Sequence, residues 1–203
     1  MVGVQGSQGY EQSVRKFVEL SQSLRFEEVC KDFLNFLPDP PSRILDAGSG
    51  AGQNAAALAE LGYSVVAIEP MGEFLEAARV AYSQYDVLWL EDSLPGLGRI
   101  PPEEASFEFI LVDGVWHHLD EEERSRSLQR FWNLLDVGGK CALSLRNGPP
   151  GLGTCVYPTD FMATLRDSKR AGFECVFVLE GQPSILEGKE DVVWCRLVLE
   201  KVT

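Results

Sequence analysis

The chain has 203 residues, of which 45% are hydrophobic and 24% are charged, and this is the composition of a single globular domain. Its 31 acidic residues outnumber its 18 basic residues, which gives a formal net charge of -13 at pH 7. Such a surface repels phosphate backbones at long range, so nucleic acid is disfavoured as a partner and a small molecule is favoured.

The N-terminal residues 1–9 are polar and glycine-rich, and we expect them to be flexible. They lack the basic start and apolar core of a signal peptide, and no apolar run approaches the ~18 residues that span a membrane. The cysteines show neither CxxC pairs nor metal-ligand spacing, which predicts buried, reduced thiols. We therefore expect a cytoplasmic protein without membrane contact. The five cysteines are Cys30, Cys141, Cys155, Cys175 and Cys195.

Apolar periodicity predicts two helices within residues 10–37, which end at the proline run 38–41. Strand and helix patterns then alternate, and this alternation is typical of parallel strands in a doubly wound sheet. Asp120 is the expected N-cap of the helix that follows it, and Gly62 is the expected end of an earlier helix. The expected strands are 43–46, 64–68, 86–90, 107–112 and 140–145, and the expected helices are 53–61, 72–82 and 121–135.

The alternation changes after residue 147. A long loop over 148–153 precedes a helix expected over 157–171, with Thr159 as its possible cap. Two β-rich segments, 173–180 and 192–202, follow with only a short turn-rich link between them. Because this link is too short for a helical crossover, the two segments are expected to pair antiparallel.

A glycine turn lies between two acidic residues near the start of the expected sheet. The first strand runs into Asp46-Ala-Gly-Ser-Gly-Ala-Gly52, and Glu69 ends the second strand. The turn has the spacing GxGxG, with Gln53 where a dinucleotide site would carry its last glycine. Asp46 disfavours a pyrophosphate and favours a cationic ligand, while Glu69 can accept both hydroxyls of a ribose. A ribose joined to a positively charged amino-acid end describes S-adenosylmethionine.

These and later motifs resemble those of the class I S-adenosylmethionine-dependent methyltransferases, specifically the small UbiE-like or type 11 group. Besides the glycine turn and Glu69, the chain has Glu91-Asp92-Ser93-Leu94-Pro95 after the third strand and Phe107-Glu-Phe-Ile110 in the fourth. Val115-Trp-His-His-Leu119 and Leu134-Leu-Asp-Val-Gly-Gly139 follow in the family's order. Glu108 replaces the family's usual Asp. The motifs cover residues 43–146.

The resemblance implies a Rossmann-like, doubly wound and mostly parallel seven-stranded sheet whose last strand is antiparallel. One methyltransferase domain is expected over 10–203. It would comprise N-terminal helices that cover the site (10–41), a half that binds S-adenosylmethionine (42–147), and an acceptor-side helix with a C-terminal hairpin (148–203). The C-terminal strands match the family's sixth and seventh strands in composition.

The resemblance also implies which residues contact the cofactor. The glycine turn would meet its amino-acid end, Glu69 its ribose, and the residues after the second and third strands its adenine. Tyr10 and Arg15 are candidates to close over it. The expected cofactor residues are Asp46, Gly48, Ser49, Gly50, Glu69, Pro70, Met71, Asp92, Ser93, Leu94, Asp113, Gly114, Val115, Tyr10 and Arg15. The product would be S-adenosylhomocysteine.

The acceptor side is less constrained by motifs. His117 is the candidate general base for a hydroxyl acceptor, whereas His118 is expected to pack the loop. Because adjacent histidines point in different directions, no metal site is expected despite Asp113 and Asp120 nearby. Arg146 could bind a substrate carboxylate or phosphate, or could pair with a loop acid. The expected substrate residues are Trp116, His117, Arg146, Asn147 and Tyr157, the last as an apolar wall or as core.

The expected function is in-line methyl transfer to an O, N or C nucleophile of an unidentified small molecule, by proximity and orientation. One alternative is a non-catalytic protein that binds S-adenosylmethionine or S-adenosylhomocysteine as a sensor or partner subunit. Another is an NAD(P)-dependent oxidoreductase, against which Gln53 argues. Either a monomer or a homodimer fits the sequence.

Overall fold

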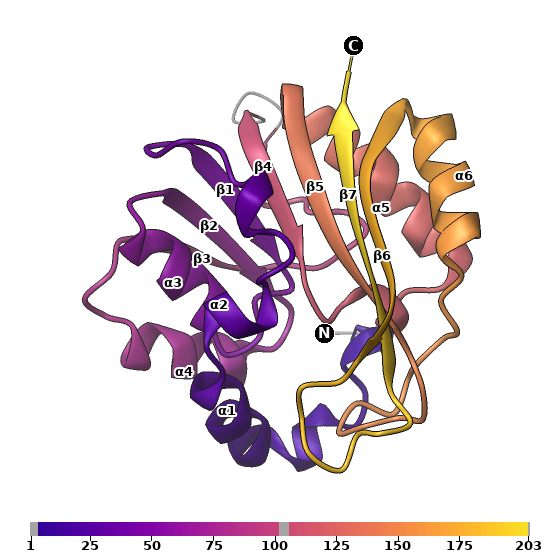
Figure 1. Cartoon of the computed structure of the whole chain (residues 1–203). Coiled ribbons are helices and arrows are strands. Elements are labelled where there is room, and N and C mark those ends of the chain that lie inside the picture. The colour runs from indigo at the N-terminus through magenta and orange to yellow at the C-terminus, as the bar shows by residue number, and fades with distance from the viewer. Residues whose placement is uncertain (1–3, 102–105, 203) are drawn as a thin grey trace.

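The computed structural model describes residues 4–101 and 106–202, and it confirms an α/β fold built on one seven-stranded sheet (Figure 1). The strand order is β3-β2-β1-β4-β5-β7-β6. The first five strands run parallel, and β7 lies antiparallel between β5 and β6. The order reverses between β1 and β4, where open α/β sheets bind ligands. The strands are β1 (Arg43–Ala47), β2 (Ser64–Glu69), β3 (Val87–Glu91), β4 (Phe107–Val112), β5 (Leu135–Asn147), β6 (Phe173–Pro183) and β7 (Val193–Lys201).

Helices cover both faces of the sheet, and two apolar clusters lie beneath them. The cluster under α5 and α6 contains Phe131 and Leu143, and the cluster under α2 and α3 contains Phe33 and Phe109. The α-helices are α1 (Val14–Ser23), α2 (Phe26–Val29), α3 (Gln53–Glu60), α4 (Gly72–Ala81), α5 (Glu121–Leu134) and α6 (Phe161–Ala171). Short 3₁₀ turns are η1 (Gln5–Ser7), η2 (Tyr10–Gln12), η3 (Leu34–Phe36) and η5 (Trp116–His118).

Helix starts agree with the sequence at α5 and differ at α6. Asp120 caps α5 in a capping box with Glu123, as predicted. Helix α6 begins at Phe161 rather than at residue 157, and its cap is Asp160, whose carboxylate accepts from the backbone N–H of Met162 at 2.8 Å. Thr159 lies one residue before the cap position, and its hydroxyl donates to the carbonyl of Arg146 at 3.3 Å.

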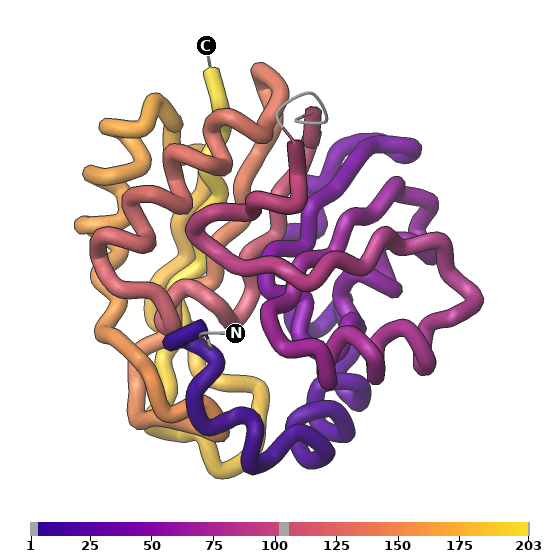
Figure 2. The backbone as a smooth tube through the Cα atoms, turned by 180° about the vertical axis from the view of Figure 1, so that it is seen from behind, coloured from indigo at the N-terminus to yellow at the C-terminus, as the bar shows by residue number. Residues whose placement is uncertain are grey.

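The N-terminal segment crosses the open end of the sheet and meets the loop after β5 (Figure 2). Thr154 N–H donates to the carbonyl of Gln8 at 2.8 Å, and Gln5 donates to the hydroxyl of Tyr157 at 2.9 Å. Of the stretch expected to be flexible, residues 1–3 lie outside the described residues, and the rest is hydrogen-bonded to this loop. The N-terminal segment and the loop after β5, which are far apart in the sequence, therefore close one end of the fold together.

Burial of the cysteines follows the prediction only in part. All five are free thiols; Cys30 and Cys141 are buried, Cys155 and Cys195 are half-buried, and Cys175 is exposed. The prediction is wrong for Cys175 because it lies on β6, the edge strand, whose outward residues are solvated.

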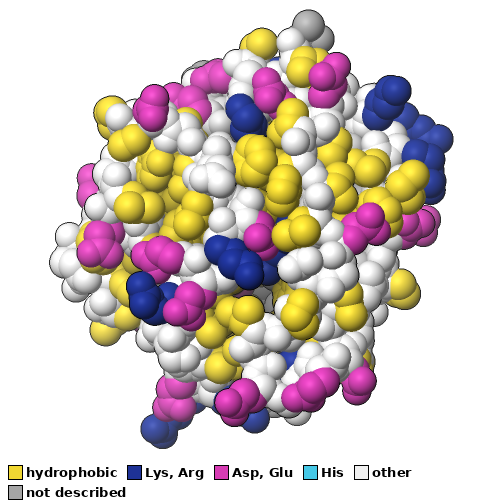
Figure 3. All heavy atoms as spheres, in the orientation of Figure 1, with side chains coloured by type: hydrophobic (Ala, Val, Ile, Leu, Met, Phe, Trp, Pro, Cys, Tyr) yellow, Lys and Arg dark blue, Asp and Glu magenta, His cyan; other side chains and the backbone are white. Residues whose placement is uncertain are grey.

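The acidic side chains are scattered and not gathered in one patch on the face drawn in Figure 3. Figure 3 shows acidic side chains spread around one face, with hydrophobic side chains exposed among them. Within the described ranges, no helix is both long and apolar enough to cross a membrane.

Candidate functional site

A cavity of about 310 Å³ opens at the carboxyl ends of the strands, beside the point where the strand order reverses. This is the size and position of a small-molecule site in an open α/β sheet. Its walls come from the turn after β1, the ends of β2 and β3, the loop after β4 and the covering N-terminal segment. The predicted residues that line it are Tyr10, Gly48, Ser49, Gly50, Glu69, Pro70, Met71, Asp92, Ser93, Leu94, Asp113, Gly114, Val115, His117 and Arg146.

The glycine turn needs its glycines. Gly48 and Gly50 have φ angles of +88° and +53°, in the left-handed region. A Cβ on Gly48 would collide with the side chain of Val115, and one on Gly50 would lie 3.2 Å from the ring of Phe17. The turn therefore presents bare backbone to the cavity while other side chains pack closely around it.

Glu69 is fixed in the cavity wall by the backbone. Its Oε2 accepts from Gly50 N–H at 3.0 Å, and its Oε1 accepts from Met71 N–H at 2.9 Å. Burial raises the pKa of Glu69 to about 7, although both backbone bonds oppose this rise. Each carboxylate oxygen can accept a second hydrogen bond, so a diol in the cavity would find two oriented acceptors.

Asp46 lies beneath the glycine turn rather than in the cavity wall, which differs from the expected direct contact. It is buried, and its Oδ2 has no hydrogen-bond partner among the described residues. Burial raises the pKa of Asp46 to about 8, with further contributions from Asp113 and Glu69. The reason for its position is that its side chain points from β1 into the fold, one residue before the chain turns.

Asp92 holds the loop that follows β3. Its Oδ1 accepts from Ser93 N–H at 2.8 Å and its Oδ2 accepts from Arg99 N–H at 2.6 Å. Asp92 thus caps this loop and also lines the cavity.

Aromatic rings, and not Arg15, cover the cavity. The Arg15 side chain is 91% exposed and pairs with Glu19 at 2.7 Å, so the expectation that it closes over a ligand is wrong. Its place on α1 faces solvent. Tyr10 contacts the rings of Phe17 and Phe74, and these two stack with centroids 4.4 Å apart. Phe17 was missed as a cavity residue, and the signal that could have found it is its position in the apolar stripe of α1.

The two histidines have different surroundings, and His118 packs the loop after β4 as predicted. Its Nε2 lies 3.1 Å from the Tyr10 hydroxyl and its Nδ1 lies 2.7 Å from the carbonyl of Cys155, so it joins the cover to the loop after β5. His117 lines the cavity and its Nδ1 has no partner among the described residues. Burial lowers the pKa of His117 well below its ordinary value, and His118 and Arg146 lower it further. His117 is therefore neutral at pH 7.

Three expected substrate residues lie elsewhere. Trp116 is fully buried and donates to the Thr164 hydroxyl at 3.3 Å, so it belongs to the core. The amide of Asn147 exchanges two hydrogen bonds with the backbone of Thr159, at 2.7 and 2.8 Å. Tyr157 contacts Gln5 outside the cavity wall. Core packing and loop anchoring decide their directions. Within the described ranges, no group of three His, Cys, Asp or Glu side chains is arranged to hold a metal ion.

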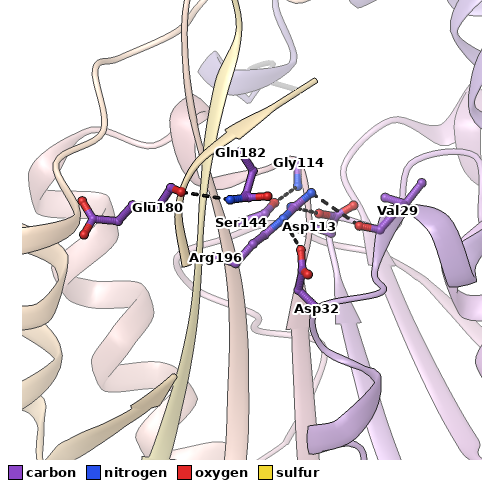
Figure 4. Close-up of polar contacts among 8 residues, drawn as sticks. All are labelled: Val29, Asp32, Asp113, Gly114, Ser144, Glu180, Gln182 and Arg196. Carbon is purple, nitrogen blue, oxygen red and sulfur yellow. Dashed lines mark hydrogen bonds and ion pairs between the residues drawn. The ribbon is translucent and has the colours of Figure 1, made fainter. Parts of the chain in front are cut away.

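Two arginines line the cavity from the far strands. Arg146 donates to the carbonyls of Pro149 at 2.7 Å and Gly148 at 3.5 Å. Arg196, which the sequence reasoning missed, donates to Asp113 at 3.0 Å and lies 3.9 Å from Asp32 (Figure 4). Only the placement of β7 beside β5 brings Arg196 to the cavity, and its apolar sequence neighbours gave no signal for it.

Comparisons with known proteins agree with this geometry. Residues 44–139 match the family model described as a methyltransferase domain. An uncharacterized methyltransferase of Mycobacterium tuberculosis is 33% identical over 107 residues, which is 53% of this chain and 41% of that protein. The chain thus spans less than half the length of this relative.

Solved structures share the fold. A TehB-like SAM-dependent methyltransferase from Corynebacterium glutamicum superposes with a TM-score of 0.67 at 22% identity, covering 96% of this chain and 97% of that one. Magnesium protoporphyrin IX methyltransferase from Synechocystis, solved with bound SAM, has a TM-score of 0.68 at 16% identity and covers 97% of this chain and 89% of its own.

Proposed function

Because residues 44–139 match a methyltransferase domain and the fold is shared with SAM-dependent methyltransferases, we propose that the chain transfers a methyl group from S-adenosylmethionine to an oxygen, nitrogen or carbon atom of a small molecule. The observation that carries this proposal is Glu69, a buried carboxylate held by two backbone N–H groups at the cavity wall. Glycine-turn backbone lies directly beside it. This pairing suits a ligand that has both a ribose and an amino-acid end.

The residues present fit the cofactor of this family. Glu69 offers acceptors for ribose hydroxyls, and hydrogen bonds to a charged group contribute about 1.5–3 kcal/mol each. Ser49 Oγ and Asn54 Oδ1 line the cavity, and neither has a hydrogen-bond partner among the described residues. Buried polar atoms without partners are costly, so these two are suited to bind polar groups of a ligand.

The chain's own residues would orient the reactants and exclude water. When bound, S-adenosylmethionine supplies a methyl group already activated on a sulfonium. Tyr10, Phe17 and Phe74 cover the cavity, and proximity then provides much of the rate. For a hydroxyl acceptor, Nδ1 of the neutral His117 is the atom that would take the proton.

The location and assembly of the whole protein are part of this proposal. Five free thiols fit a reducing cytoplasm, and the small cavity fits a small-molecule acceptor. We propose a monomer or homodimer. The alternative of a non-catalytic binding protein uses the same cavity, and catalysis of methyl transfer distinguishes the two.

Calorimetric titration with S-adenosylhomocysteine tests the cofactor site. Glu69→Gln should weaken binding at least about tenfold, because a neutral amide cannot accept on both sides of the ribose. Glu91→Gln is the matched control, since Glu91 pairs with Glu69 in the register of β2 and β3 but does not line the cavity. Equal loss in both variants would contradict the assignment. Binding of NADH in place of S-adenosylhomocysteine would support an oxidoreductase.

Catalysis is tested with S-adenosylmethionine carrying a labelled methyl group and a small-molecule extract. Label should pass from the cofactor to a small molecule in the presence of wild-type protein and not with Glu69→Gln. Cofactor binding without any transfer would favour the non-catalytic alternative.

A further inference from the structure

Arg146 is a buried cation for which the described residues provide no acidic partner. Its side chain leaves the end of β5 and lines the cavity, and the residue is 8% exposed. Its two hydrogen bonds go to backbone carbonyls of the loop that follows, and no acid among the described residues forms a salt bridge with it. A buried guanidinium with free N–H groups is costly unless an anion comes to it.

The other arginines of this region have their partners within the protein. Arg196 lines the same cavity but faces Asp113 and Asp32. Arg124 is also buried, but all three of its nitrogens donate to carbonyls of Trp116, Tyr157 and Pro158, and it lies outside this cavity. Arg146 is thus the arginine of this cavity whose charge is not paired with an acid among the described residues.

The residues around Arg146 form the rest of a candidate binding subsite. Arg146 pairs across the strands with Trp194, whose ring meets His117 edge-on with centroids 6.2 Å apart. The same cavity has an apolar wall from the N-terminal helices and the link between β6 and β7. That wall includes Leu20, Leu24, Val29, Ile185 and Leu186. One flat cation beside aromatic and aliphatic surface is suited to an acid with an apolar body.

We propose that Arg146 is the anion-binding residue of the acceptor subsite and that the methyl acceptor is a small, mainly apolar molecule with a carboxylate. This inference rests on the proposed methyl transfer and specifies its substrate class. The guanidinium binds the carboxylate through two parallel hydrogen bonds, and the apolar wall covers the rest of the acceptor molecule. His117 lies beside Trp194 on the side of the cavity that receives the acceptor.

The carboxylate could come instead from the amino-acid end of the cofactor. The strand order favours the acceptor, because the glycine turn and Glu69 follow β1 and β2 whereas Arg146 and Trp194 belong to β5 and β7, beyond β4. Two ligands distinguish the sources. S-adenosylhomocysteine has the amino-acid carboxylate and methylthioadenosine lacks it.

The first experiment measures both nucleosides by calorimetry on wild type and Arg146→Gln. We expect the ratio of their affinities to change less than about twofold in the variant, since Arg146 does not hold the cofactor carboxylate. A selective loss of S-adenosylhomocysteine affinity would assign Arg146 to the cofactor and overturn the proposal.

The second experiment measures acid recognition by saturation-transfer NMR. The probes are benzoate, 3-phenylpropionate and octanoate, each with its primary amide, and each is titrated with and without S-adenosylhomocysteine. At least one acid should bind about tenfold more tightly than its amide to wild type, and this preference should vanish in Arg146→Gln.

Arg130→Gln is the control variant, because Arg130 also donates to backbone carbonyls but does not line the cavity. It should keep the acid preference. No preference in wild type, or a preference that survives in Arg146→Gln, overturns the proposal. Failure of S-adenosylhomocysteine to bind would count against the methyltransferase function alone, since the acid probes are also titrated without it.

Discussion

Arg196 on β7 and Asp113 in the loop after β4 form a buried ion pair, with Nη1 of the arginine 3.0 Å from Oδ1 of the aspartate (Figure 4). The same guanidinium lies 3.9 Å from Asp32, so one cation faces two acids from distant segments. Next to this pair, Gly114 N–H donates to the hydroxyl of Ser144 at 2.7 Å. The loop that borders the cavity is thereby fixed to β5 and β7.

Removal of this cation should destabilise the fold. Arg196→Met removes the cation that faces the half-buried Asp113 and Asp32, and breaking a fully buried pair costs about 3–5 kcal/mol, which is the upper bound here. Urea denaturation measures the loss. The control is Arg25→Met, whose pairs with Glu27 and Glu28 are exposed and should contribute less than about 1 kcal/mol. Similar small losses in both variants would show that Arg196 is not structural.

Substitution of Gly48 and of Gly114 should distinguish the effect of a close side-chain contact from the effect of backbone strain. Gly48→Ala places a methyl group against Val115 at a φ of +88°, whereas Gly114→Ala has a φ of +72° with nothing within 4 Å of the new carbon. Strain of this kind costs about 1–3 kcal/mol. Gly48→Ala should lose more stability and more S-adenosylhomocysteine affinity than Gly114→Ala, and Val115→Ala should restore part of the difference. Thermal melting and calorimetry measure both effects. Equal losses would contradict the contact.

The acids near the turn should make the ligand-free protein less stable as pH rises. Burial raises the pKa of Asp46 from 3.8 to about 8 and that of Glu69 from 4.5 to about 7. The folded state therefore binds these protons more tightly than the unfolded state. Their stabilising contribution is complete below the lower values and is lost as pH passes the raised ones.

Denaturation between about pH 5 and pH 8 should show a decrease of the order of a few kcal/mol. Asp46→Asn should flatten this decrease and should raise stability at the alkaline end. Glu69→Gln should keep most of the contribution of Asp46, because burial is the largest cause of its raised pKa and the Glu69 charge adds a smaller part. A wild-type profile that rises over this range would mean that both acids are ionised in the folded protein at low pH.

The aromatic cover should matter for ligand binding where the exposed cation of α1 does not. Phe17→Ala removes a ring that stacks on Phe74 and faces Gly50, so S-adenosylhomocysteine affinity should fall about tenfold as apolar surface is lost from the cover. Arg15→Ala should change it less than about twofold, because that side chain points to solvent. Calorimetry measures the S-adenosylhomocysteine affinity of both variants. Tighter binding to Phe17→Ala than to wild type would show that the ring occupies the space of the ligand.

The cofactor half could be predicted from sequence because its signals are local. The strand, the glycine turn and the next helix are contiguous, and Glu69 falls at a strand end that period and composition define. The alternation of elements also predicted the parallel sheet, and the short link after residue 180 predicted the antiparallel pair at its end. Helix boundaries erred where loop hydrogen bonds competed, as at Asp160 and Thr159.

The acceptor half could not be predicted in the same way because tertiary contacts decide it. Trp116 and His117 are neighbours in sequence, yet one turns into the core and the other into the cavity. Arg196 reaches the cavity only through the pairing of β7 with β5, 83 positions from the aspartate that it meets. No local sequence pattern predicts a contact between residues that are so far apart in the chain.

The insertion of β7 between β5 and β6 also sets the order in which the molecule can be completed during synthesis. Strands β1 to β4 have all their sheet neighbours once β5 has emerged from the ribosome, whereas β5 lacks one neighbour and β6 has none until Lys201 has emerged. In that interval the edge of β5 is unpaired and Asp113 lacks its arginine. The glycine turn and Glu69 can therefore take their places in the sheet before the wall with Trp194 is added.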